Sequence, residues 1–170
     1  MTDTFAAEGT DPDFTYSHPG QSRFRRALIR AVERASGQPM LRGLYKDWQS
    51  GPRRDESVFD AALRLLQIAP RITWHAPLAS IPQTGGLLLV ANHPYGIIDG
   101  LALGQLGMRL RGNVQILTNS VLCQPPEIAP HLLPIDFSGT AEGRKASGQS
   151  RRLAVELLTA GKVVALFPGG

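Results

Sequence analysis

The chain has 170 residues, of which 42% are hydrophobic and 19% are charged. This composition suits a globular domain with an additional helical segment, and its apolar fraction excludes a fully disordered chain. The single cysteine, Cys123, excludes a disulfide framework and a cysteine-rich zinc site. The longest nearly apolar stretch, residues 85–91, is far shorter than the roughly 20 residues of a membrane-spanning helix, so the sequence predicts no such helix.

Charge is unevenly distributed along the chain. Residues 1–20 contain four acidic residues and no lysine or arginine, whereas residues 21–54 contain nine basic residues against two acidic ones, a net charge of +7. A basic block favours anionic partners, such as an acidic lipid surface or an acidic carrier protein. Nucleic acid is not expected as a partner, because aromatic residues make up only 6% of the chain and no recognition motif is present.

The first 69 residues divide into a tail and a basic helical segment. Residues 1–20 hold glycine and proline with little apolar periodicity, which predicts a disordered tail, and they lack the features of a secretory signal. Apolar side chains at helical spacing predict a helix at 21–36 and two more at 40–49 and 57–68. The helix at 21–36 is rich in arginine, and two interpretations of it remain open: it lies on an anionic membrane, or it packs on the α/β part of the chain with its arginines in solvent.

From residue 70 onward, short apolar runs alternate with helical patterns. Alternating strands and helices predict an α/β fold with a mostly parallel sheet flanked by helices. Strands are expected at 72–74, 87–91, 114–117, 135–137 and 163–167, helices at 101–110 and 149–160, and a proline-rich connection at 121–134.

These patterns predict a disordered tail (1–20), a basic helical segment (21–69) and an α/β domain (70–170). The sequence stops directly after a buried-type strand, at the place where α/β proteins build their sites. We therefore expect the C-terminal part of this domain to be missing.

The most informative stretch is ANHPYGIIDG, residues 91–100, between a predicted buried strand and a predicted helix. A histidine next to a carboxylate can act as a general base, since the carboxylate fixes the imidazole tautomer and stabilises the imidazolium. His93 and Asp99 form such a pair if Gly96 allows the loop to fold back. Alternatively, Asp99 only caps the following helix, and His93 and Pro94 form a strand-exit turn.

Other kinds of site are not indicated. The sequence has no G-x-S-x-G elbow, so we expect direct attack by a substrate hydroxyl or water. His18, His75 and His131 have no carboxylate at useful spacing, and the dispersed histidines predict neither a metal site nor a metal cofactor. Gly169 and Gly170 could expose backbone amides to an oxyanion, although a turn is the simpler interpretation.

The stretch NHPYGIIDG and a later strand ending in LFPGG (residues 166–170) together resemble the glycerolipid acyltransferase superfamily, whose first motif is N-H-x4-D. This superfamily includes the 1-acylglycerol-phosphate acyltransferases. The form H-P-x-G-x-x-D-G is most similar to the hemolysin-like branch, which includes lyso-ornithine-lipid acyltransferases. The resemblance covers residues 70–170.

The resemblance implies an O-acyltransferase that moves a fatty acyl group from acyl-CoA or acyl-carrier protein to a lysolipid hydroxyl. It implies that His93 is the general base, that Asp99 orients and stabilises it, and that the acyl thioester is a co-substrate, with no metal or redox cofactor. Residues implied in substrate binding are Asn92, Pro94, Gly96, Gly100, Phe167, Pro168 and Gly170.

The resemblance also implies peripheral attachment to the cytoplasmic face of the inner or plasma membrane, where an anionic membrane surface would be a partner. Two alternatives remain open. One is a non-catalytic lipid-binding module on the membrane surface, and the other is a thioester or ester hydrolase in which His93 activates water.

This sequence departs from the family pattern at three points. The spacing from His93 to Asp99 is one residue longer than the commonest form, and the glutamate of the third motif is absent because the sequence stops before it. Phe137, in the segment 133–137 that matches the second motif, stands where many members have an arginine for the acceptor phosphate. Loss of this clamp favours a lyso-amino-acid lipid as acceptor, unless a nearby basic residue substitutes. The candidates are Arg144, Lys145, Arg151 and Arg152.

Overall fold

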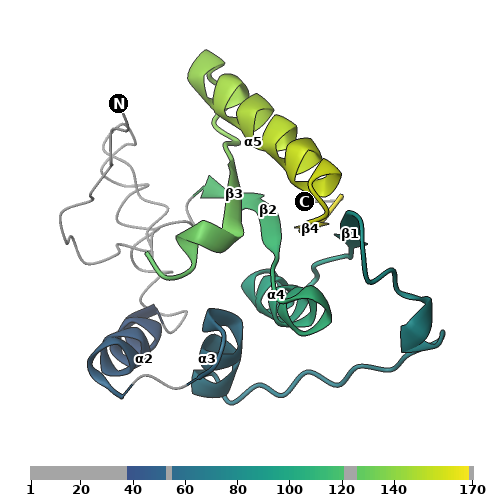
Figure 1. Cartoon of the computed structure of the whole chain (residues 1–170). Coiled ribbons are helices and arrows are strands. Elements are labelled where there is room, and N and C mark those ends of the chain that lie inside the picture. Colours follow the sequence, from purple (N-terminus) through teal and green to yellow (C-terminus); the bar gives the residue numbers. More distant parts are fainter. Residues whose placement is uncertain (1–37, 53–54, 121–125, 169–170) are drawn as a thin grey trace.

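The computed structural model describes residues 38–52, 55–120 and 126–168 (Figure 1). The predicted tail at 1–20 and the predicted helix at 21–36 lie outside the described residues. Two helices come first, α2 (Gln38–Ser50) and α3 (Val58–Leu65), and they confirm the helices predicted at 40–49 and 57–68. α3 is shorter than predicted: it begins after Ser57, whose hydroxyl accepts a hydrogen bond from the Asp60 backbone N–H (3.1 Å), and it ends at Leu65.

Four parallel strands form one sheet in the order β1-β4-β2-β3. This confirms the predicted α/β fold with a parallel sheet flanked by helices. Because β4 lies between β1 and β2, the last strand in the sequence occupies the middle of the sheet. The strands are β1 (Leu87–Val90), β2 (Gln115–Asn119), β3 (Leu132–Ile135) and β4 (Val163–Leu166). They are joined by α4 (Ile97–Arg111), by a segment with a 3-10 turn (Ala129–His131), and by α5 (Ala141–Thr159).

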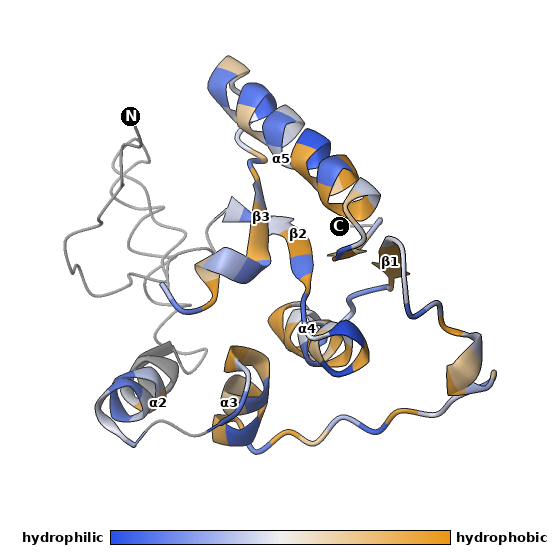
Figure 2. Cartoon of the chain, in the orientation of Figure 1, coloured by the Kyte–Doolittle hydropathy of each residue, from blue (hydrophilic) through white to orange (hydrophobic). Residues whose placement is uncertain are grey.

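Alternate residues of β4 face two different layers of helices. Val163 and Ala165 belong to a core shared with α3 and α4, whereas Val164 belongs to a second core with Leu133 of β3 and Ala154 of α5. Figure 1 accordingly shows α5 on one side of the sheet and α4 on the other. Figure 2 shows the sheet strands as mostly hydrophobic and α5 as a mixture of hydrophilic and hydrophobic residues. A strand buried on both faces is a continuous apolar run, which is why β4 is predictable from sequence.

α3 packs on α4 through a close contact. The buried ring of Phe59 lies where a side chain at Gly104 would be, because an added Cβ there would come within 2.3 Å of the ring. Phe59 and Leu63 share the core of α4 and the sheet. α3 is thus part of the α/β core, although the predicted boundary falls at residue 70; the three-part division itself stays a prediction.

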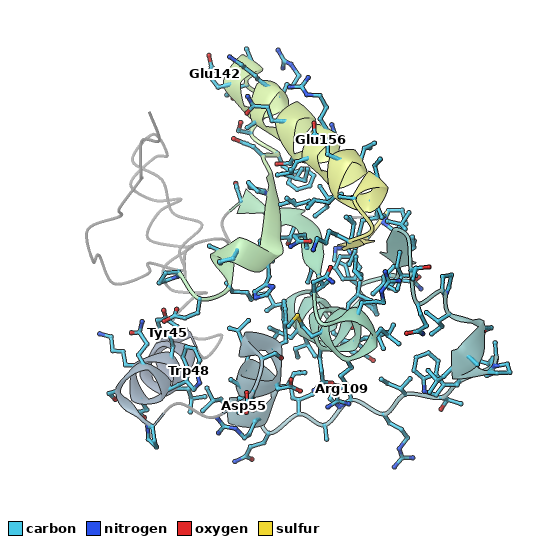
Figure 3. The ribbon with its side chains drawn as sticks, in the orientation of Figure 1. Tyr45, Trp48, Asp55, Arg109, Glu142 and Glu156 are labelled. Atoms are coloured by element: carbon cyan, nitrogen blue, oxygen red, sulfur yellow. The ribbon has the colours of Figure 1, made fainter. Side chains whose placement is uncertain are left out.

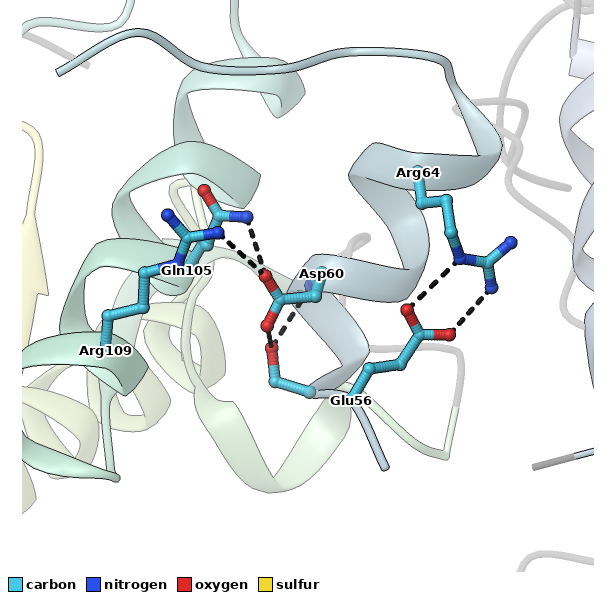
Figure 4. Close-up of polar contacts among 6 residues, drawn as sticks. Glu56, Asp60, Arg64, Gln105 and Arg109 are labelled. Atoms are coloured by element: carbon cyan, nitrogen blue, oxygen red, sulfur yellow. Dashed lines mark hydrogen bonds and ion pairs between the residues drawn. The ribbon is translucent and has the colours of Figure 1, made fainter. Parts of the chain in front are cut away.

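A polar cluster joins the same two helices beside this contact (Figure 4). Asp60 accepts hydrogen bonds from the Ser57 hydroxyl (2.6 Å) and from Nε2 of Gln105 (2.7 Å), and it forms an ion pair with Arg109 (3.4 Å). The hydrogen bond from Ser57, supported by Gln105 and Arg109, lowers the pKa of the Asp60 carboxyl against the opposing effect of desolvation. The cluster therefore stabilises the α3–α4 contact more when Asp60 is ionised than when it is protonated.

Two of the predicted strands differ from the structure: one is absent, and the other lies at a different position. Residues 72–74 are not in a strand: Ile72 and Trp74 are exposed, and β-branched and aromatic residues form a strand only where a neighbouring strand takes their backbone hydrogen bonds. The strand predicted at 135–137 lies at 132–135 instead, so its first three residues fall in the proline-rich connection predicted at 121–134. Pro134 is accepted there because β3 is an edge strand.

Two helices begin earlier than predicted. α4 begins at Ile97, four residues before the predicted start, and α5 begins at Ala141, eight residues before it. The buried positions in the first half of α5 are glycine and serine, so they show no apolar periodicity. Ser147 and Ser150 instead donate hydrogen bonds to the carbonyls of Asp136 (3.2 Å) and Pro134 (2.6 Å).

Candidate active site

His93 and Phe167 lie next to each other at the carboxyl edge of the sheet. His93 follows the end of β1 and Phe167 follows the end of β4, two neighbouring strands whose last residues, Val90 and Leu166, are paired. The two rings are stacked, with centroids 4.9 Å apart and planes 14° apart. The sheet therefore brings together the two stretches that carry the family resemblance, at the edge where α/β folds place ligands.

The loop after β1 depends on a glycine. The carbonyl of His93 accepts a hydrogen bond from the backbone N–H of Gly96 (3.1 Å), which closes a tight turn over residues 94–96. Gly96 has φ 61° and ψ −116°, a conformation that is essentially restricted to glycine. A glycine is therefore favoured at this point of the loop, and α4 begins at the next residue; that the loop brings His93 and Asp99 together stays a prediction.

Asp99 lies in the first turn of α4. Its Oδ2 accepts a hydrogen bond from the backbone N–H of Tyr95 (2.7 Å), which lies in the turn before the N-cap residue Gly96. The interpretation of Asp99 as the N-cap of this helix is wrong, because the helix begins at Ile97 and Gly96 holds the N-cap position; Asp99 instead fixes the turn that precedes the helix. Among the described residues no hydrogen bond joins the side chains of His93 and Asp99, and their pairing stays a prediction.

The other predicted site residues are distributed along the same edge. Asn92 and Pro94 are exposed in the loop after β1, and the half-buried Gly100 donates its N–H to the carbonyl of Gly96 (3.3 Å). Pro168 is exposed directly after Phe167, whereas Gly170 lies outside the described residues. Their roles in substrate binding stay predictions.

Three exposed apolar residues lie in this loop and at the start of α4, and none of them is among the predicted site residues. The exposed fractions are 75% for Tyr95, 53% for Ile97 and 39% for Ile98. Their sequence signal is unusual, because a helix start is typically polar, yet α4 begins with two isoleucines after an aromatic residue. The carboxyl edge next to His93 thus presents an apolar surface, which we call the Tyr95 patch (Tyr95, Ile97 and Ile98).

The segment that matches the second motif lies farther along the same edge. β1 and β3 are the two outer strands, so three strand spacings, roughly 14 Å, separate their ends. After β3, the Ser138 backbone N–H donates to Oδ1 of Asp136 (2.7 Å) and lowers the pKa of that carboxyl, with a further contribution from the Ser138 side chain. Phe137 is 64% exposed. Arg144, in the first turns of α5, donates to the carbonyl of Gly139 (2.5 Å).

α5 also carries three further basic residues of the sequence analysis, Lys145, Arg151 and Arg152, and all three are exposed. Figure 3 shows the acidic residues Glu142 and Glu156 on the same helix, so its outer surface carries both signs of charge. Among the described residues, no three His, Cys, Asp or Glu side chains are arranged to hold a metal ion. In the same part of the chain, no helix has the length and apolar character needed to cross a membrane.

Two curated proteins are similar to part of this chain. One, from Phocaeicola vulgatus, is named lyso-glycine lipid O-acyltransferase and is 41% identical over 64 residues, which are 37% of this chain and 23% of that protein. The other, from Bacteroides thetaiotaomicron, has the same name and is 38% identical over 63 residues, 36% of this chain and 23% of the relative. The match thus spans about a quarter of the length of these relatives. No protein-family model and no solved structure matches the chain.

Proposed function

We propose that this protein is an O-acyltransferase that moves a fatty acyl group from acyl-CoA or acyl-carrier protein to the hydroxyl of a lysolipid. The observation that carries the proposal is the placement of His93 beside Phe167, where the two motif-bearing stretches meet at the carboxyl edge of a parallel sheet. Support also comes from the partial similarity to two proteins named lysolipid O-acyltransferases.

In the proposed reaction, a ring nitrogen of His93 takes the proton from the acceptor hydroxyl. The hydroxyl oxygen forms a bond to the thioester carbonyl carbon, the carbon–sulfur bond then breaks, and the leaving thiolate takes the proton from the imidazolium. The new ester and the free thiol are the products. Asp99 is proposed to steady the imidazolium; an ionised carboxylate accepts several hydrogen bonds, so the bond from Tyr95 leaves acceptor capacity on the same group.

The proposed acceptor is a lyso-amino-acid lipid rather than a lysophosphatidic acid. Phe137 offers an exposed phenyl ring where a phosphate-binding family member has a guanidinium. Arg144, the nearest basic substitute in sequence, donates one of its groups to the carbonyl of Gly139. The absence of a positive charge at position 137 suits an acceptor without a phosphate group. The name of both relatives refers to a glycine lipid.

The general base is tested by replacing His93 with glutamine. We expect His93→Gln to lower acyl transfer by at least about 10²-fold, the lower range for loss of a general base, while the melting temperature stays unchanged. His75→Gln is the matched control, because His75 is exposed outside the candidate site. Wild-type transfer by His93→Gln, from both acyl-CoA and acyl-carrier protein, would contradict the assignment.

We further propose that the protein attaches peripherally to the cytoplasmic surface of the membrane, with the Tyr95 patch entering the lipid interface. Amphipathic aromatic and aliphatic side chains suit this position. The patch lies within five residues of His93, so the contact would bring the site to a lipid acceptor. The basic segment 21–54 supports attraction to anionic lipid.

Vesicle co-sedimentation tests this contact. Replacing Tyr95 and Ile97 together with serine removes two exposed apolar side chains, and we expect about tenfold weaker binding to phosphatidylcholine vesicles. The matched control replaces the exposed Leu153 and Val155 of α5 with serine and is expected to bind as the wild type does. Equal loss of binding in both double variants, or in neither, would contradict the proposed orientation.

A further inference from the structure

We infer that Phe167 is a positioning residue for His93: its ring face holds the imidazole in an orientation that leaves both ring nitrogens open. This inference rests on the proposed function. It assigns to Phe167 a role different from the acceptor binding that the family resemblance implies. The starting observation is the stacked pair, with ring centroids 4.9 Å apart and an interplanar angle of 14°.

The geometry of stacking determines what remains free on the imidazole. The N–H bond and the lone pair of a neutral imidazole lie in the ring plane and point outward from the ring. Because the plane of His93 is nearly parallel to that of Phe167, both nitrogens point alongside the phenyl ring and not into it. One nitrogen can then receive the acceptor proton while the other meets an acidic partner.

A second histidine of the same chain shows the other arrangement. His131 meets Phe59 edge to face, with centroids 5.3 Å apart and an interplanar angle of 65°, and its Nδ1 lies 3.3 Å from the carbonyl of Val114. The edge-to-face contact and the backbone partner give the His131 ring a structural role. Among the described residues, no hydrogen bond or ion pair joins the His93 ring to another group, so its ring nitrogens stay available for chemistry.

Phe167 is the better fixed member of the pair. It directly follows β4, whose residues Val163, Val164 and Ala165 have no exposed surface. The register between β1 and β4 fixes how far along the strand direction Phe167 lies relative to the end of β1. His93 lies three residues beyond β1, in a loop. A half-buried ring on the sheet can therefore orient an imidazole on the loop, and its electron-rich face also favours the imidazolium that proton transfer creates.

Kinetics of Phe167→Leu separates positioning from acceptor binding. Leucine keeps an apolar side chain but removes the ring face, so we expect kcat to fall about tenfold with KM for the lysolipid unchanged. Phe167→Tyr keeps the ring and should retain kcat. A residue that binds the acceptor gives the opposite pattern, a raised KM with little change in kcat.

Proton NMR of the purified protein gives a readout that is independent of activity. The imidazole signals of His93, assigned by their loss in His93→Gln, should be shifted upfield by the phenyl ring. They should move downfield in Phe167→Leu, stay in place in Phe167→Tyr, and stay in place in the control Leu153→Ala on the exposed side of α5.

The outcomes distinguish this inference from the proposed function. The positioning role is overturned if Phe167→Leu raises KM with unchanged kcat, or if the His93 signals do not move in that variant. In either case, acyl transfer by the wild-type protein still upholds the proposed function. A wild type without transfer overturns the proposed function and the kinetic role together, and the NMR signals still decide whether Phe167 orients the ring.

Discussion

Gly96 and Asp99 determine the local structure of the loop that carries His93. A histidine and a carboxylate after a buried strand predict a base and its partner, and Gly96 between them has a positive φ that favours glycine. Spacing could not decide where the carboxylate points, and Asp99 meets the backbone of Tyr95. The stack of His93 on Phe167 was not predictable, because it depends on which strands are neighbours.

At the same scale, Asp60 gives a stability prediction with a defined pH dependence. The folded-state pKa of Asp60 lies below its ordinary value of 3.8, so the stabilisation is complete above that value and is lost as the pH falls through the folded pKa. We expect Asp60→Asn to lower the free energy of unfolding at pH 7 by about 1 kcal/mol, a value reduced for partial exposure. The difference from the wild type should shrink below about pH 4.

Chemical denaturation at a series of pH values measures this effect. Asp55→Asn, at an exposed acid close in sequence to α3, is the control and should stay within about 0.5 kcal/mol of the wild type. A difference between Asp60→Asn and the wild type that grows as the pH falls would contradict the assigned direction of the pKa shift.

At the scale of elements, the predictions succeed where apolar residues carry the pattern and fail where small or polar residues do the packing. β1 and β4 are apolar runs, and their positions agree with the predicted strands within one residue. The first half of α5 packs through Gly143, Ser147 and Ser150, which no apolar pattern reveals. Conversely, residues 72–74 have strand-forming side chains but no neighbouring strand.

Glycine positions in helices give the matching prediction. Gly104→Ala places a methyl group against the buried Phe59 ring, and overpacking of this kind should cost about 1–3 kcal/mol of unfolding free energy. Gly148→Ala in α5 is the control: no atom lies within 4 Å of its added Cβ, so alanine should stabilise the helix by about 0.4–1 kcal/mol. Thermal denaturation measures both, and stabilisation by Gly104→Ala would contradict the close α3–α4 packing.

For the whole molecule, alternating strands and helices were enough to predict a parallel α/β sheet, but not the order of its strands. The order β1-β4-β2-β3 places the last strand beside the first, and this pairing brings His93 to Phe167. Long-range pairing leaves no local signal in a single sequence, so the candidate site could be predicted as two separate stretches and not as one place. The sheet order also puts the Tyr95 patch at one end of the carboxyl edge and Phe137 at the other.

We propose that the site around His93, at the carboxyl edge of the sheet, transfers an acyl group to a lipid alcohol. The most direct measurement follows a labelled acyl thioester incubated with the purified protein and a lyso-glycine lipid, with mass spectrometry of the products. With the wild-type protein we expect label in the diacylated lipid and one equivalent of free thiol per ester formed. Both products should be lost in His93→Gln. Label found only in free fatty acid would indicate a hydrolase, and vesicle binding with an unconsumed thioester would indicate a binding module; either result would contradict the account.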